Sequence, residues 1–285
     1  MVDPMRIRRF LQLLRIHNVA GAAIGDIMGY VVFTSWHVRP FSLVLSVIVV
    51  ALVAAAGYVI NDVFDVEIDK VNKPNRPLPS GDVSIREAKI LAMAFFVVGV
   101  IAAIPLGFYP LAVAVVTSLL LFLYAYRLKK EGFLGNLVVA LTTGLSILFG
   151  GLAVSVYAFT SISLIIPVVY SFLLTLGREV IKGIEDYWGD SSNGVKTLAV
   201  RLGVRNAWNT AKGLLITTAA ISPLPILFRY NPIYLVLLVG FLFYLIKTLT
   251  LPHSIEDAAL GSNYLKFAAI IGILAFLIGS IPILI

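Results

Sequence analysis

The sequence predicts an all-helical protein that crosses a membrane nine times. Three observations carry this prediction: 60% of the 285 residues are hydrophobic, only 13% are charged, and the mean hydropathy is +0.98. Soluble domains have roughly 45–50% apolar and about 25% charged residues. The apolar residues also fall into nine runs, each near the roughly 20 residues that a bilayer requires of a helix.

The runs follow one another without a Ser/Gly/Pro-rich linker or a soluble segment, so residues 1–285 are predicted to form a single domain. The basic, amphipathic stretch before the first run has no small-residue cleavage site, and no removable signal peptide is expected. The predicted spans are residues 16–36, 41–60, 88–107, 109–126, 134–154, 161–176, 208–227, 232–251 and 264–285.

The charges are distributed very unevenly between the two sides of these spans. If the N-terminus is cytoplasmic, every lysine and arginine except Arg39 and Arg229 lies at the cytoplasmic side, as the positive-inside rule favours. The net charge of +7 is therefore assigned to membrane topology, and nucleic acid is not an expected partner. The chain has no cysteine, which excludes disulfides, thiolate metal sites and a cysteine nucleophile. We expect a multi-pass cell-membrane protein whose chemistry takes place at the cytoplasmic face.

An acidic cluster directly follows the second predicted span. If that helix continues, Asp62, Asp65 and Asp69 fall at positions i, i+3 and i+7 and share one face. Like charges so spaced repel, and a divalent cation relieves the repulsion. A set of hard oxygen ligands suits Mg²⁺, which completes its coordination shell with substrate phosphates. The alternative is a solvated acidic helix end with no ligand.

A second charged cluster follows the sixth predicted span, on the same side of the membrane. Glu179, Lys182, Asp186 and Asp190 follow one another at steps of three, four and four residues, again on one helical face. Charged residues at membrane depth are rare and tend to be functional. The recurrence suggests a weak internal duplication, with two acidic helix ends that face one another. Carboxylates there would hold the metal, and basic side chains the remaining phosphate oxygens.

The motifs resemble those of a known family. Asn61-Asp62-x-x-Asp65-x-x-x-Asp69, followed by residues 72–77 (Asn-Lys-Pro-Asn-Arg-Pro), resembles the first motif of the UbiA-type intramembrane prenyltransferases. Asp186-x-x-x-Asp190, followed by residues 193–197, is similar to the second. The resemblance implies nine transmembrane helices around a central cavity, capped by cytoplasmic loops and helices. It also implies Mg²⁺-dependent transfer of an isoprenoid from an allylic diphosphate to an acceptor.

Residues 177–186 are most similar to the archaeal digeranylgeranylglyceryl phosphate synthases of this family. That likeness implies transfer of a geranylgeranyl group from geranylgeranyl diphosphate to geranylgeranylglyceryl phosphate, which forms the second ether bond of an archaeal membrane lipid. An aromatic acceptor, as in quinone or chlorophyll synthesis, remains the alternative within the family. A phosphate-bearing acceptor agrees with the large number of cations near the motifs, although the positive-inside bias also explains some of them.

Site residues are assigned on the same basis. Catalysis and metal binding are expected of Asp62, Asp65, Asp69, Asp186 and Asp190. Contacts with the substrates are expected of Asn61, Lys73, Arg76, Lys129, Lys182, Lys196, Arg15, Asn18 and Tyr126. Asn61 could instead be a helix cap. The family's Tyr-x-x-x-Lys element is one residue shorter here, Tyr126 to Lys129. Asp26 lies in the middle of the first predicted span and either lines the cavity or forms a structural hydrogen bond.

Two functions from other classes are alternatives to an enzyme. A transporter of small anions or a lipid flippase also uses intramembrane charge and internal repeats. Transporters, however, place their sites near the bilayer midplane, whereas both clusters here lie at one face and the other face is nearly uncharged. A purely structural membrane subunit would leave both acidic clusters unexplained.

Overall fold

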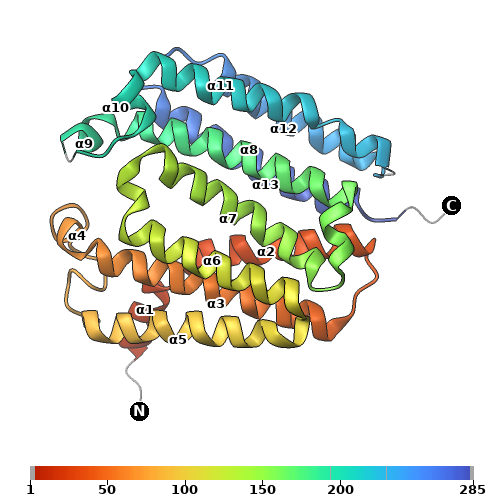
Figure 1. Ribbon diagram of the computed structural model, residues 1–285. Helices are drawn as coiled ribbons and strands as arrows, with labels where there is room; N and C mark the ends of the chain where they lie inside the picture. The colour runs from red at the N-terminus through yellow and green to blue at the C-terminus, as the bar shows by residue number, and fades with distance from the viewer. Residues whose placement is uncertain (1–3, 193, 229, 283–285) are drawn as a thin grey trace.

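The computed structural model describes residues 4–192, 194–228 and 230–282, and every regular element within them is a helix. Long helices lie side by side in one bundle, and the short helices α4, α9 and α10 gather at one of its ends (Figure 1). The α-helices are α1 (Pro4–Leu13), α2 (Ile16–Thr34), α3 (Pro40–Phe64), α4 (Val66–Asn72), α5 (Ile85–Ala103), α6 (Phe108–Tyr126), α7 (Phe133–Leu152), α8 (Ile162–Glu185), α9 (Tyr187–Ser192), α10 (Leu198–Leu202), α11 (Val204–Ile221), α12 (Ile233–Leu249) and α13 (Ala258–Gly279). Four 3₁₀ helices join them: η1 (Ile104–Leu106), η2 (Leu128–Glu131), η3 (Val156–Thr160) and η4 (Leu224–Phe228).

Nine apolar helices correspond to the nine predicted spans. Within the described residues, eight segments are long and apolar enough to cross a membrane, and α12 is apolar but has only 17 residues. An all-helical membrane protein is thus confirmed, with one short span. The seventh predicted span is interrupted near Pro223, which lacks a backbone donor, and continues as η4. Arg229 and the end of the last predicted span, residues 283–285, lie outside the described residues.

The last span begins six residues earlier than the sequence predicts. Its helix α13 starts at Ala258, directly after a turn in which the Ser254 hydroxyl accepts a hydrogen bond from the Asp257 N–H at 3.1 Å. Glu256 and Asp257 before the helix, and Ser262 and Asn263 in its second turn, interrupt the apolar run, although the backbone is already helical from Ala258. The Ser254 contact closes the preceding turn, and the N-cap residue Asp257 makes no side-chain hydrogen bond to the helix.

The centre of the bundle is a very close crossing of α2 and α7. A Cβ atom added to Gly29 would lie 1.7 Å from the carbonyl oxygen of Ile147, and one added to Gly150 would lie 2.0 Å from the carbonyl oxygen of Asp26. Small residues at such positions let two membrane helices approach backbone to backbone. Helix α3 packs against α2, and α8 packs against α7. The crossing therefore fixes how the two helices that carry the motifs are placed relative to each other.

Both motif helices end in the same way, and here the expected continuous helix is wrong. Helix α3 stops at Phe64, Asp65 forms a joint (φ −93°, ψ −1°), and α4 follows. Helix α8 likewise stops at Glu185, with Asp186 (φ −88°, ψ 10°) joining it to α9. The carbonyl of each joint residue still accepts an i→i−4 hydrogen bond from the helix that follows, from the Asp69 N–H to Asp65 and from the Asp190 N–H to Asp186, both at 2.8 Å. The suggested internal duplication thus has a structural counterpart in two helix–joint–helix units.

Candidate active site

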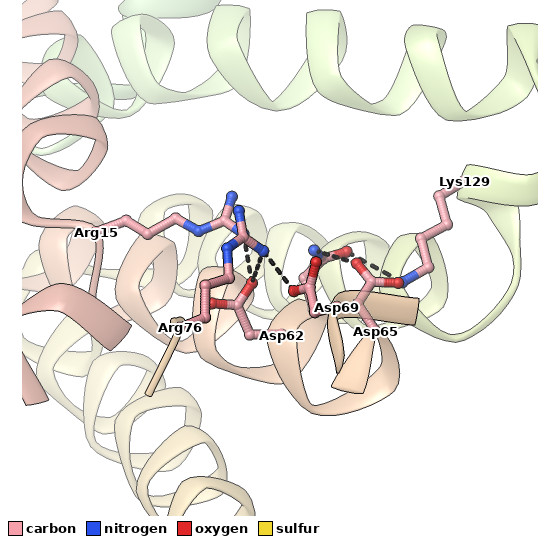
Figure 2. A network of polar contacts seen from close by, with 7 residues as sticks. Arg15, Asp62, Asp65, Asp69, Arg76 and Lys129 are labelled. Carbon is pink, nitrogen blue, oxygen red and sulfur yellow. Dashed lines mark hydrogen bonds and ion pairs between the residues drawn. The ribbon is translucent and has the colours of Figure 1, made fainter. Parts of the chain in front are cut away.

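The first motif forms a compact network of carboxylates and cations (Figure 2). Arg15 is paired with Asp62, and Lys129 with Asp65. Arg76 joins Asp69 at 2.5 Å and Asp62 at 3.3 Å. Three carboxylates are therefore matched by three cations, which removes the mutual repulsion of the acids. This balance allows Asp62 and Asp69 to be buried, at 4% and 5% exposed.

Asn61 connects two members of this network. Its amide nitrogen donates to Asp65 at 2.9 Å, and its carbonyl oxygen accepts from Lys129 at 3.4 Å. Asn61 is the fourth residue from the end of α3, whose N-cap is Arg39 and whose C-cap is Asp65, so the alternative of a helix cap does not apply. Its side chain instead fixes the positions of the Asp65 carboxylate and the Lys129 ammonium group relative to each other.

Arg15 reaches the network because the chain bends sharply at that residue. It stands between α1 and α2 with φ 50° and ψ 54°, a left-handed conformation that is costly for a residue with a side chain. Its guanidinium contacts Asp62 and also lies over the ring of Tyr58, 5.6 Å from the centroid. Strained residues persist where the surroundings determine them, and they cluster at functional sites.

The second motif is more open than the first. Lys182 lies 3.3 Å from the carboxylate of Glu179. Asp186 is exposed and Asp190 half-buried, and neither has an ion-pair partner within the part of the chain that the structure describes. Burial, and secondly the charge of Asp186, raise the pKa of Asp190 to about 6. The two aspartates thus form an uncompensated acidic pair.

Backbone contacts connect the η2 turn after α6 to the loop that follows the second motif. The Lys196 N–H donates to the Lys130 carbonyl at 3.3 Å, and a Cβ atom at Gly132 (φ +61°) would overlap the carbonyl oxygen of Lys196 at 1.8 Å. Gly132 is therefore a position where only glycine allows the approach. The contact joins the η2 turn, which carries Lys129 of the first network, to the loop that follows Asp190.

Four sequence-predicted residues lie outside the network of the first motif. Asn18 is exposed in the first turn of α2, and Lys73 and Lys196 are exposed in loops at the motif end of the bundle. Tyr126 is 61% exposed and packs against Phe64 and Phe122 in an aromatic cluster. The structure brings none of these four side chains onto the carboxylates.

Asp26 proves to be remote from the first motif. It is fully buried between α2 and α3, where the Ser46 hydroxyl donates to it at 2.8 Å. Ser46 precedes Asp62 by 16 residues of α3, which is roughly 24 Å at 1.5 Å per residue. Of the two alternatives for Asp26, the structural hydrogen bond describes its position.

No motif in the sequence indicates the contacts that hold the loop after the first motif. Arg9 of α1 pairs with Asp82 at 3.0 Å and donates to the Asn75 carbonyl at 3.4 Å. This ties α1 to the segment that carries Arg76. No spacing in the sequence signals a partnership between residues so far apart, and only the basic character of α1 pointed to it.

The whole chain is similar to known proteins. The model of the UbiA prenyltransferase family matches residues 22–280.

The chain belongs to the UbiA prenyltransferase family.

Relatives of this UbiA chain cover its full length. It is 51% identical to a digeranylgeranylglyceryl phosphate synthase of Saccharolobus solfataricus, over 98% of this chain and 99% of that one. It is 34% identical to the synthase of that name from Methanocaldococcus jannaschii, over 98% of both chains. A solved structure from work on digeranylgeranylglyceryl phosphate synthase in membranes has a TM-score of 0.84 at 34% identity and covers 97% of this chain and 99% of that one.

A more distant structure supports the UbiA fold. A UbiA homologue from Archaeoglobus fulgidus, solved with DMAPP and Mg²⁺, has a TM-score of 0.68 at 19% identity, over 92% of this chain and 98% of that one.

The carboxylates of this UbiA chain suit a shared metal better than a closed protein cage. Within the described residues, no three His, Cys, Asp or Glu side chains lie close enough together to hold a metal ion by themselves. Mg²⁺ is usually bound by one or two carboxylates together with waters and substrate phosphates. Asp186 and Asp190, which have no ion-pair partner among the described residues, would supply such a donor pair, and the acids of the first network would supply oxygens once their cations took other partners.

Proposed function

We propose that the chain transfers a geranylgeranyl group from geranylgeranyl diphosphate to geranylgeranylglyceryl phosphate and releases diphosphate. The observation that carries this proposal is the 51% identity, over nearly the whole chain, to a protein named digeranylgeranylglyceryl phosphate synthase. The two acid-and-cation clusters on α3 and α8 supply the chemistry that such a reaction needs.

Mg²⁺ is the proposed cofactor, held by Asp62, Asp65 and Asp69 on one side and by Asp186 and Asp190 on the other. It would neutralise the negative charge that grows on the departing diphosphate. A homologue solved with DMAPP and Mg²⁺ supports this choice of metal and of donor class.

The cations of the first network have a second role in this proposal. Arg15, Arg76 and Lys129 neutralise the carboxylates in the structure. When the donor binds, they exchange these carboxylates for phosphate oxygens, so that no buried charge loses its partner. Asn61 is hydrogen-bonded to both Lys129 and Asp65 and holds these two side chains in position during the exchange. Lys73 and Lys196 are exposed at the same end and are proposed to contact the outer phosphate.

Tyr58 is the proposed stabiliser of the allylic cation. The Arg15 guanidinium already lies over its ring at 5.6 Å, which means that the ring face accepts a positive charge. Tyr58 precedes Asp62 by one helical turn, so its ring is about 6 Å further along α3 than the carboxylate. A carbon next to the diphosphate would lie at that level.

The acceptor's phosphate is proposed to bind Lys182 and neighbouring cations. Lys182 lies between Glu179 and Asp186 on the face of α8, where the positive-inside bias explains a lysine least. Asn18 and Tyr126 are exposed near the same end and are proposed to contact the lipid parts of the substrates. Residues 1–285 act as one domain around a central cavity, with the N-terminus and both motifs at the cytoplasmic face of the cell membrane.

Reconstitution of the purified protein tests the proposal. Membranes or nanodiscs receive labelled geranylgeranyl diphosphate, Mg²⁺ and one acceptor: geranylgeranylglyceryl phosphate, its dephosphorylated form, or 4-hydroxybenzoate. We expect the doubly alkylated lipid phosphate to form, and turnover of the dephosphorylated acceptor to be at least about tenfold lower, the scale of one lost charge-assisted contact. Chelation with EDTA should stop the reaction and added Mg²⁺ should restore it.

Three results would contradict the proposal. Equal turnover of the dephosphorylated acceptor would remove the phosphate site. Preference for 4-hydroxybenzoate would assign the chain to the aromatic-acceptor enzymes of the family. Prenyl transfer that survives chelation would remove the metal from the mechanism.

A further inference from the structure

Glu179 is a partly buried acid to which the proposed reaction assigns no role so far. Its side chain is 13% exposed and extends from α8, seven residues before Asp186. At 1.5 Å per residue it lies about 10 Å further along the helix axis than the acidic joint. Tyr58 stands at the matching level of α3, seven residues before Asp65. Glu179 and Tyr58 therefore occupy corresponding positions in the two helix–joint–helix units.

The surroundings of Glu179 place it on the side of the reacting carbon. Its carboxylate acts electrostatically on the hydroxyl of Tyr58 in α3 and on that of Tyr124 in α6, and Arg15 acts on both. The charge of Glu179 therefore acts across the bundle at the level of Tyr58, the ring proposed to stabilise the allylic cation.

Two cations hold Glu179 loosely on its own helix. Arg178 lies 3.5 Å from the carboxylate, and Lys182 lies 3.3 and 3.4 Å from its two oxygens. These contacts are longer than the charge-assisted hydrogen bonds of about 2.7–2.9 Å that a tight pair makes. Arg178 also donates from Nε to the Ser262 carbonyl of α13 at 3.4 Å. The carboxylate thus keeps acceptor capacity for a further donor such as a hydroxyl.

Formation of an ether requires that a proton leave the acceptor. The acceptor hydroxyl oxygen forms a bond to the first carbon of the donor, the bond from that carbon to the diphosphate oxygen breaks with its electron pair, and the hydroxyl proton must be transferred to a base. In the proposed function the five aspartates of the motifs hold the metal, and in the structure Asp62, Asp65 and Asp69 are also paired with cations. Glu179 is the partly buried acid that remains for this proton, about two turns of α8 before the acidic joint.

We propose that Glu179 is the general base that accepts the proton from the acceptor hydroxyl, an inference that rests on the proposed function. An acceptor phosphate on Lys182 and Arg178 would bring the glycerol hydroxyl next to Glu179, since all three side chains lie within one turn of α8. The same phosphate would draw both cations away from the carboxylate. Glu179 then binds a proton more readily only when the acceptor is in place.

A change of nucleophile tests this role. Wild type and Glu179→Gln are assayed with geranylgeranylglyceryl phosphate and with an analogue in which a thiol replaces the reacting hydroxyl. With the hydroxyl acceptor, Glu179→Gln should lower kcat by about 100-fold, within the range for loss of a general base. With the thiol the loss should stay under about tenfold, because a thiol with a pKa near 8.5 ionises with little assistance. The KM for the donor should not change.

Matched variants make the result decisive. Glu185→Gln removes an exposed carboxylate from the same helix and should behave as wild type with both acceptors. Glu179→Asp keeps a carboxylate but moves it away from the acceptor, so it should lose more activity with the hydroxyl acceptor than with the thiol. This variant serves as the test if Glu179→Gln fails to fold. Equal losses with both acceptors would show that Glu179 only holds Arg178 and Lys182, and an undiminished rate would show that the leaving diphosphate takes the proton. Wild type that alkylates neither acceptor would overturn the proposed function itself.

Discussion

At the scale of single residues, the carboxylates of the two motifs differ in burial and in ion pairing. Asp62 is buried against Arg15 and Arg76, so its removal would leave Arg15 without a carboxylate, while Arg76 would keep its contact with Asp69. Asp186 is exposed and unpaired among the described residues, and its neighbour Asp190 has a pKa raised by burial and by the charge of Asp186. Loss of Asp186 would therefore relieve repulsion in the free protein, and any loss of activity would report on the metal alone.

We expect Asp186→Ala to reduce prenyl transfer by more than about 100-fold, which exceeds the 10–100-fold effect of losing a residue that merely supports a metal ligand. Its unfolding temperature in detergent should equal or exceed that of wild type. Both quantities are measured on the same purified sample. Glu185→Ala, at the adjacent exposed position, is the control and should retain wild-type turnover. An active Asp186→Ala variant would exclude this residue from the metal site.

At the scale of elements, the close crossing of α2 and α7 decides whether the motif helices meet. Helix α3 is packed on α2 and α8 on α7, so a change in the spacing of the central pair moves the two motifs apart. The crossing depends on glycine at Gly29, where any side chain would overlap the backbone of α7. Gly21 lies on the same helix with nothing near its missing Cβ.

We expect Gly29→Ala to destabilise the fold by about 1–3 kcal/mol, the usual cost of overpacking, and to lower activity because the two motifs separate. Thermal unfolding in detergent and prenyl transfer are the measurements. Gly21→Ala, which adds the same methyl group to α2 where the structure leaves space, should keep both properties unchanged. Unaltered stability and activity of Gly29→Ala would contradict the crossing as described.

On the scale of the whole molecule, the charged and the uncharged ends define an orientation in the membrane. Helices α4, α9 and α10 lie at one end of the bundle (Figure 1), where Val71 is 82% exposed. The turn between α2 and α3 contains His37, also exposed. The positive-inside rule predicts that the first end lies in the cytoplasm and the second outside.

The absence of cysteine makes this orientation directly measurable. We expect a membrane-impermeant thiol reagent added to intact cells to label a His37→Cys variant and not a Val71→Cys variant. Permeabilised cells, in which both variants should react, provide the control for accessibility. Labelling of Val71→Cys alone in intact cells would reverse the topology and place the proposed site on the outer face.

The sequence by itself determined the all-helical membrane fold, the positions of nine apolar helices and the end of the bundle that carries the motifs. Hydrophobicity, chain length and charge are local properties, and they are sufficient for these features. The sequence also indicated the candidate site aspartates, because their spacing and the resemblance to the UbiA-type family are visible in the chain. They are Asp62, Asp65, Asp69, Asp186 and Asp190. Whether these residues bind magnesium stays a prediction.

Only the tertiary structure decided which charges meet. The pairing of Asp62 with Arg15, the link between Lys129 and Asp65 and the contact of Arg9 with Asp82 join residues between 47 and 73 positions apart. Such contacts depend on how helices cross, and the crossing depends on packing of small residues that no charge pattern encodes. The breaks at Asp65 and Asp186 were likewise invisible, because helical spacing is the same on both sides of each joint. The sequence therefore specified the chemical groups, and the packing of α2 against α7 specified their geometry.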